Sequence, residues 1–95
     1  MDNTDIARQL LAHAARLDHI DPNLYRRRAF RRAAESVLAE QLPVTDLLRT
    51  RGRAGLRALT GIGDGLARAI EELVRTGEIS FPLQVIRTPA GAVSK

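Results

Sequence analysis

The chain has 95 residues, no cysteine and a formal net charge of +4 at pH 7, so it suits one small domain and is too short for a multidomain enzyme. The lack of cysteine excludes disulfides and thiolate zinc sites, and with only two histidines we expect no catalytic metal. No apolar run is long enough to span a membrane and no secretory signature begins the chain, so we expect a cytoplasmic protein without membrane contact.

The first predicted helix covers about residues 3–18, with Asn3 or Thr4 as its cap. Its apolar side chains recur at helical spacing and should bury one face: Ile6, Leu10, Leu11, Ala14 and Leu17. The two histidines, His13 and His19, are six positions apart and fall on different faces. We therefore expect both at the surface or at its boundary.

A turn at residues 21–23, which read Asp-Pro-Asn, leads into a second predicted helix over about residues 24–41. The apolar positions of this helix also keep helical spacing: Ala29, Phe30, Ala33, Val37, Leu38 and Leu42. Arginines fill its early turns, and residues 26–57 carry nine arginines against three acidic residues, a net charge of +6. Such a concentrated positive segment favours nucleic acid as the partner, with a solvated helical face as the alternative.

Proline and glycine divide the rest of the chain into shorter helices. Pro43 ends the second helix, Gly52 breaks the third, and Gly77 is placed to end the last one in a left-handed conformation. The predicted helices cover about residues 44–50, 53–59 and 64–76. We expect one domain over residues 1–79, followed by a partly ordered or flexible tail over residues 80–95 that carries an apolar patch from Phe81 to Ile86.

The stretch from Leu56 to Ile70 reads LRALTGIGDGLARAI and predicts two helices joined by a glycine turn. Gly61 and Gly63 permit positive φ angles and lack Cβ atoms, while Ile62 between them should point into the core. The helix that follows begins with unpaired N–H groups and the positive end of its dipole, an arrangement that can hold a phosphate. The alternative is that the glycines only make a tight connection between helices.

The spacing of seven residues in this stretch resembles the helix-hairpin-helix motif of DNA-repair proteins: Leu56, Leu59, Gly61, Ile62, Gly63, Ala67 and Ile70. Thr60 stands where that family usually has proline. Together with the segment LYRRRAFRRAA at residues 24–34, the turn looks like part of the N-terminal domain of family X DNA polymerases, the DNA polymerase beta type. This resemblance covers about residues 3–79 and implies a compact all-α domain of four to five helices with a SAM-like fold.

The domain that the chain resembles binds the 5′ side of gapped DNA, and some members remove a 5′-deoxyribose phosphate through a lysine Schiff base. The resemblance puts Ala69 at the position of the nucleophilic lysine and Gly65 at that of its supporting lysine, and the only lysine in the chain is Lys95. Arginine stays protonated and cannot replace the lysine. We therefore expect a non-catalytic module that binds DNA without reading its sequence; retained lyase activity is the less favoured alternative.

The resemblance also implies a 5′-phosphate site surrounded by Tyr25, Arg26, Phe30 and Arg57. Its two arginines stand where lysines are usual, and they can grip phosphate with two donors each. Phe30 is at least as well explained as a core aromatic. A run of four arginines either contacts DNA or forms a solvated face: Arg27, Arg28, Arg31 and Arg32. The predicted DNA-binding residues are Tyr25, Arg26, Arg27, Phe30, Arg31, Arg57, Gly61, Ile62, Gly63, Gly65 and Arg68.

We expect no required cofactor. The family's hairpin binds a monovalent cation through backbone carbonyls, and the resemblance transfers this site to Arg57, Leu59 and Ile62, with potassium or sodium as the ion. The expected partner is duplex, gapped or nicked DNA during repair or replication. As an alternative, the domain dimerises or docks onto a separate polymerase, nuclease or phosphoesterase chain through the patch from Phe81 to Ile86.

Overall fold

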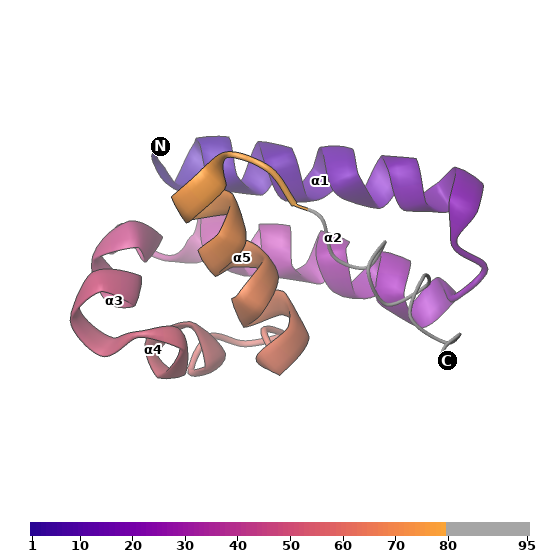
Figure 1. The fold of residues 1–95 in the computed structure, drawn as a ribbon. Coiled ribbons are helices and arrows are strands. Elements are labelled where there is room, and N and C mark those ends of the chain that lie inside the picture. The colour runs from indigo at the N-terminus through magenta and orange to yellow at the C-terminus, as the bar shows by residue number, and fades with distance from the viewer. Residues whose placement is uncertain (80–95) are drawn as a thin grey trace, which may run out of the picture.

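The computed structural model describes residues 1–79 and contains five helices in that range. They are α1 (Asn3–Ile20), α2 (Leu24–Ala39), α3 (Val44–Arg51), α4 (Arg53–Arg57) and α5 (Asp64–Thr76). Figure 1 shows α1 and α2 side by side as a long antiparallel pair, with α5 packed across them and the short helices α3 and α4 at one end. The prediction of an all-α domain with four to five helices is confirmed.

A single core holds the helices together, because α1, α2, α4 and α5 each turn an apolar face inward. The largest fully buried side chains are Ile6, Leu10, Leu17, Phe30, Val37, Val44, Leu56, Ile70 and Leu73. Three leucines that share the predicted spacing lie instead on the outer side and are about half exposed: Leu11, Leu38 and Leu42. Leu11 and Leu38 each lie one position away from a fully buried residue of their helix, so the buried stripe is narrower than the apolar one. Leu42 lies beyond the end of α2, in the connection to α3.

The start of α1 differs from the prediction. Asp2, and not Asn3 or Thr4, is the cap: its side chain accepts the Asp5 N–H at 2.8 Å, and the Asp5 side chain accepts the Asp2 N–H at 3.3 Å. Asn3 has a long-range role, because its Nδ2 donates to the Leu42 carbonyl at 3.0 Å and its Oδ1 accepts the Val44 N–H at 2.8 Å. The beginning of α1 is thereby fastened to the connection between α2 and α3.

The expectation that His13 lies at the surface or boundary is wrong. His13 is 3% exposed, its ring lies 4.8 Å from the Phe30 ring, and its Nδ1 is 3.0 Å from Arg16 Nη2. The physical reason is periodicity: position 13 falls three residues after Leu10 and four before Leu17, in the middle of the buried stripe of α1. An imidazole can occupy such a position because its flat ring packs like a small aromatic.

Two carboxylates join α1 and its C-terminal turn to α2. Asp21 is buried and accepts the Asn23 N–H at 2.9 Å and Arg26 Nη1 at 2.8 Å. These two bonds, the backbone one first, hold the pKa of Asp21 below its ordinary value of 3.8 against the opposing effect of burial. Asp18 accepts from Arg31 and also faces Arg27, and the bond from Arg31 lowers the Asp18 pKa in the same way.

We predict that acid destabilises the domain through these carboxylates. Because the pKa of Asp21 is lower in the folded state than in the unfolded one, its stabilising effect is present above about pH 4 and is lost as the pH falls further. Thermal unfolding followed by circular dichroism from pH 7 to pH 2.5 should show a falling midpoint, and Asp21→Asn should flatten that fall. The exposed Asp46→Asn serves as the control; an equal fall in the wild type and Asp21→Asn would contradict the prediction.

Candidate nucleic-acid interface

The turn between α4 and α5 covers residues 58–63, and its two glycines have different structural reasons. Gly61 has a φ of +79°, and a Cβ atom there would lie 2.8 Å from Cγ of Arg32. Both the conformation and the close approach therefore require glycine. Gly63 has a φ of −90° and open space where its Cβ would stand, so nothing within residues 1–79 requires a glycine there.

Ile62 is buried, as predicted, and its side chain anchors the turn in the core. Gly63 is the cap of α5 and supplies no side-chain hydrogen bond. The Ala67 N–H donates to the Gly63 carbonyl at 2.9 Å, and the amides of residues 64–66 precede that first helical bond. The N-terminus of α5 thus presents backbone donors and the positive end of the helix dipole without a capping side chain.

A groove of ≈ 290 Å³ lies between this turn and α2. Its lining residues are Asn23, Tyr25, Arg26, Ala29, Gly61, Gly63, Gly65 and Leu66. The structure therefore brings together five of the predicted DNA-binding residues, two from α2 and three glycines from the turn and α5. Tyr25 is 75% exposed and supplies an aromatic face at the edge of the groove.

The arginines of α2 fall into two classes that the sequence did not separate. Arg26 pairs with buried Asp21, while Arg27 and Arg31 both face Asp18, at 3.6 and 2.5 Å. These three guanidinium groups are held by α1 and the turn after it. The predicted DNA contacts of Arg27 and Arg31 thus compete with intramolecular ion pairs, although both side chains keep some exposure.

Arg28 and Arg32 are the exposed arginines of α2 that make no ion pair with any of residues 1–79. They are four positions apart and therefore share one face of the helix, and Arg32 passes beside Gly61. Both belong to the run of four arginines for which DNA contact or a solvated face was predicted, but the set of predicted DNA-binding residues does not include them. Helical spacing could have identified Arg28 and Arg32 from the sequence, because residues 25, 28, 32 and 36 lie along one stripe of a helix.

Arg57 and Arg68 reach the N-terminus of α5 but are paired there with one carboxylate. Arg57 Nη1 lies 3.2 Å from Asp64 Oδ1, and Arg68 Nε lies 3.6 Å from Asp64 Oδ2. All three side chains are well exposed. Both arginines are thus close to the predicted phosphate site, and Asp64 was not among the predicted site residues.

Phe30 does not line the groove. It is fully buried between α1 and α2 beside His13, so its placement at the phosphate site is wrong and its interpretation as a core aromatic is right. Phe30 shares the buried face of α2 with Ala33, Ala34 and Val37, which directs its ring into the core. Ala69 is also fully buried, while Gly65 lines the groove.

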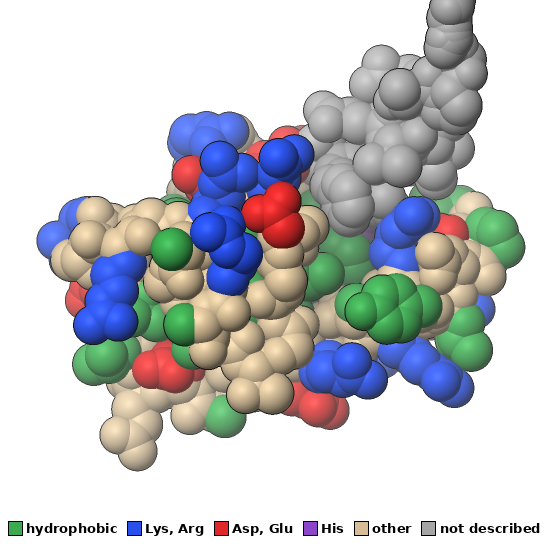
Figure 2. Space-filling model, turned by 90° about the horizontal axis from the view of Figure 1, so that it is seen from below, with side chains coloured by type: hydrophobic (Ala, Val, Ile, Leu, Met, Phe, Trp, Pro, Cys, Tyr) green, Lys and Arg blue, Asp and Glu red, His purple; other side chains and the backbone are tan. Residues whose placement is uncertain are grey.

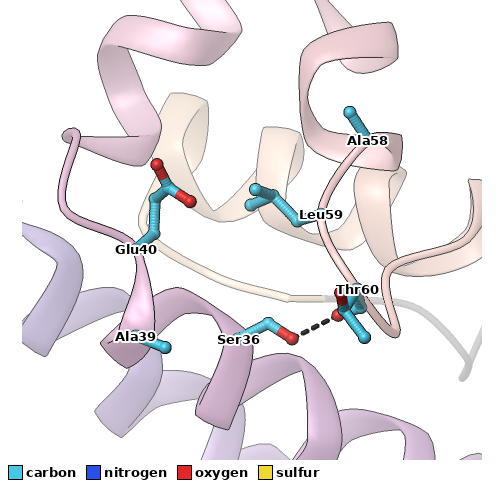
Figure 3. A pocket seen from close by; sticks show the side chains of 6 residues that line it. All are labelled: Ser36, Ala39, Glu40, Ala58, Leu59 and Thr60. Carbon is cyan, nitrogen blue, oxygen red and sulfur yellow. Dashed lines mark hydrogen bonds between the residues drawn. The ribbon is translucent and has the colours of Figure 1, made fainter.

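A second hollow of ≈ 320 Å³ lies further along α2, on the other side of the turn. Figure 3 shows its lining residues, Ser36, Ala39, Glu40, Ala58, Leu59 and Thr60, with the Ser36 hydroxyl donating to the Thr60 carbonyl. Of the carbonyls predicted to hold a cation, that of Leu59 accepts the Ile62 N–H at 3.2 Å. The potassium or sodium site stays a prediction.

Figure 2 shows the face below α2 and the short helices. Arginine side chains stand in several groups around a central area of backbone and uncharged side chains, with a few carboxylates among them. This is the distribution that suits an anionic chain lying across the face, with cations on several sides of an open backbone surface.

A model of the helix-hairpin-helix domain matches residues 1–79. No curated protein and no solved structure matches the chain. None of the helices in residues 1–79 has the length and apolar character needed to cross a membrane. The predicted apolar patch from Phe81 to Ile86 and the lone Lys95 lie outside the described residues.

Proposed function

The chain belongs to the helix-hairpin-helix domain family, and on this basis we propose that it is a non-catalytic module that binds the DNA backbone without reading sequence. The observation that carries the proposal is the groove between α2 and the glycine turn. Three glycines, the uncapped N-terminus of α5 and the exposed Tyr25 meet there. Because Gly61, Gly63 and Gly65 leave the backbone beside the groove open, it offers amides to phosphate oxygens and does not reach base edges, so we expect affinity without sequence specificity.

The finer proposal concerns the DNA structure and the process. We propose that the groove holds the 5′-phosphate side of gapped or nicked DNA in repair or replication, as the resemblance to the DNA polymerase beta type of N-terminal domain implies. Arg26 supports this, because it lines the groove while its ion pair with Asp21 fixes its direction. A potassium or sodium ion at the carbonyls of Arg57, Leu59 and Ile62 would bridge the turn to a phosphate.

The absence of catalysis is also a proposal. Ala69 is enclosed in the core, and within residues 1–79 the groove is lined by no lysine or histidine, so this part of the chain places no amine there to form a Schiff base. Borohydride trapping on abasic-site DNA tests this point, and a covalent adduct would show retained lyase activity. Docking onto another protein through the patch from Phe81 to Ile86 needs no DNA, and failure to bind any DNA would favour it.

Fluorescence anisotropy distinguishes these possibilities. Labelled intact, nicked and one-nucleotide-gapped duplexes of the same sequence, with and without a 5′-phosphate, are titrated at several salt concentrations. We expect binding to all of them, tightest to the 5′-phosphorylated gap, with an affinity that falls with salt by a log-log slope of roughly −0.9 per phosphate neutralised. No binding at low salt, or equal binding to an acidic polymer of matched charge, would overturn the proposal.

We predict that the pair Arg28→Ala and Arg32→Ala weakens DNA binding more than removal of the paired arginines does. These two guanidinium groups have no ion-pair partner within residues 1–79 to give up, so their full charge is available to phosphates. The salt slope should become shallower by about 2, one for each phosphate that the variant no longer neutralises.

Arg8→Ala provides the control, because Arg8 is exposed and pairs with Asp5 on α1, and Figure 1 shows α1 on the side of the molecule away from the turn between α4 and α5. Its salt slope should equal that of the wild type. If the double variant and Arg8→Ala have the same affinity and slope, the face of α2 beside the turn is not the interface.

A further inference from the structure

Asp64 is the first residue of α5 and stands between two glycines that line the groove, Gly63 and Gly65. Its two carboxylate oxygens face different arginines, Arg57 at 3.2 Å from α4 and Arg68 at 3.6 Å from the next turn of α5. A negative group therefore already lies at the N-terminus where an external anion would bind, and it engages two cations that could hold such an anion.

The carboxylates that pair with arginines of α2 are less exposed than Asp64. The side chain of Asp64 is 61% exposed, whereas that of Asp18 is 35% exposed and that of Asp21 is 3% exposed. The two less exposed acids fasten α2 to α1 and its C-terminal turn. An exposed ion pair contributes little to stability because water screens it, so Arg57 and Arg68 can leave Asp64 at little cost when a better acceptor arrives.

We propose that Asp64 is an affinity-setting residue of the hairpin: its carboxylate acts as an internal competitor for the DNA phosphate that Arg57 and Arg68 would otherwise hold. This inference rests on the proposed DNA-binding function and names the residue that limits its strength. Carboxylate and phosphate both accept from guanidinium groups in the same bidentate manner. Their pairing with Asp64 holds both arginines at the N-terminus of α5, so a phosphate that displaces the carboxylate there meets the first helix amides and the cations together.

A different role must be separated from this one. An acidic residue in the first turn of a helix stabilises that helix through the dipole, and Asp64 can do so whether or not DNA binds. The two roles predict different effects of Asp64→Asn, one on the unfolding midpoint and the other on the affinity for DNA. Loss of helix stabilisation lowers the unfolding midpoint, while loss of the competitor raises the affinity for DNA, and a purely structural residue would not raise affinity.

The experiment measures both quantities on the full chain with the 5′-phosphorylated gapped duplex at 0.15 M salt, where charges act over about 8 Å. Asp64→Asn should lower the Kd about threefold to tenfold, the effect of removing one negative charge a few ångströms from a bound phosphate. Its unfolding midpoint should stay the same or fall slightly. Asp46→Asn makes the same charge change on α3, where Asp46 pairs with Arg49 at 2.6 Å, and should change the Kd much less.

A double-mutant cycle assigns the gain to the two arginines. In a chain that carries Arg57→Ala and Arg68→Ala, the further change Asp64→Asn should improve the affinity by clearly less than it does in the wild type. If the wild type binds DNA but Asp64→Asn binds no tighter, or the gain is the same without the arginines, this inference fails and the proposed function stands. If the wild type binds none of the duplexes, the proposed function fails and the inference falls with it.

Discussion

Gly63→Asp should weaken DNA binding about 10- to 100-fold and leave the domain as stable as the wild type. The backbone at Gly63, with φ −90° and ψ −167°, is one that other residues adopt, and a Cβ atom there meets nothing within 4 Å. Aspartate is also a preferred helix cap. Its carboxylate would accept the amides at the start of α5 that we assign to the phosphate, and the charge-assisted hydrogen bonds that DNA would then forgo are each worth about 1.5–3 kcal/mol.

The measurement pairs anisotropy titration with urea unfolding, and Gly61→Ala is the contrasting variant. At Gly61 the φ of +79° and the side chain of Arg32 both oppose a Cβ atom, so alanine should cost about 1–3 kcal/mol of unfolding free energy. We thus expect substitution of Gly63 to affect DNA binding and substitution of Gly61 to affect stability. Wild-type affinity in Gly63→Asp would remove the N-terminus of α5 from the interface.

Phe30→Ala should lower the free energy of unfolding by about 3–5 kcal/mol, the usual cost of removing a buried aromatic ring. Phe30 is fully buried and packs on His13, and a domain of this size has a total stability of roughly 4–12 kcal/mol. The variant should therefore be close to unfolding at 37 °C. Urea denaturation at 25 °C measures the loss.

Two further variants show whether Phe30 acts through the core or on DNA. Phe30→Leu, which keeps most of the apolar volume, should retain much of the stability and bind DNA as the wild type does. Tyr25→Ala removes an exposed ring at the edge of the groove, so it should leave stability nearly unchanged and weaken DNA binding. If Phe30→Leu is as stable as the wild type but no longer binds DNA, Phe30 contributes to the DNA interface and its assignment to the core alone is wrong.

Helix boundaries could be predicted where a glycine or proline determines them through its own backbone conformation. Gly77 has the predicted left-handed conformation with a φ of +86°, and α5 has the predicted limits, residues 64–76. The second helix was predicted to reach residue 41 and ends at Ala39, because Glu40 is already extended. At the start of α1, three successive residues are good caps, and the distant partners of Asn3 decide between them.

The position of the glycines in the groove could be predicted from the sequence, but the ion pairing of the nearby arginines could not. Local spacing predicted a turn at Gly61 and Gly63 directly before α5, since glycine permits the conformations that such a turn requires. It did not show which arginines are free, because Arg31 meets Asp18 from a position thirteen residues away on another helix. Such pairings depend on how α1 and α2 lie against each other. His13 was misplaced for a different reason: the prediction used its spacing from His19 and not its position between Leu10 and Leu17 in the apolar stripe.

The hairpin is fastened to α2 at two neighbouring points, by the Ser36 hydroxyl on the Thr60 carbonyl and by the stem of Arg32 against Gly61. Its conformational freedom is consequently lost when the domain folds and not when DNA arrives. A preorganised turn of this kind needs no backbone rearrangement after encounter, and exchange of exposed side-chain ion pairs is fast, so association should proceed in one kinetic step whose observed rate rises linearly with DNA concentration.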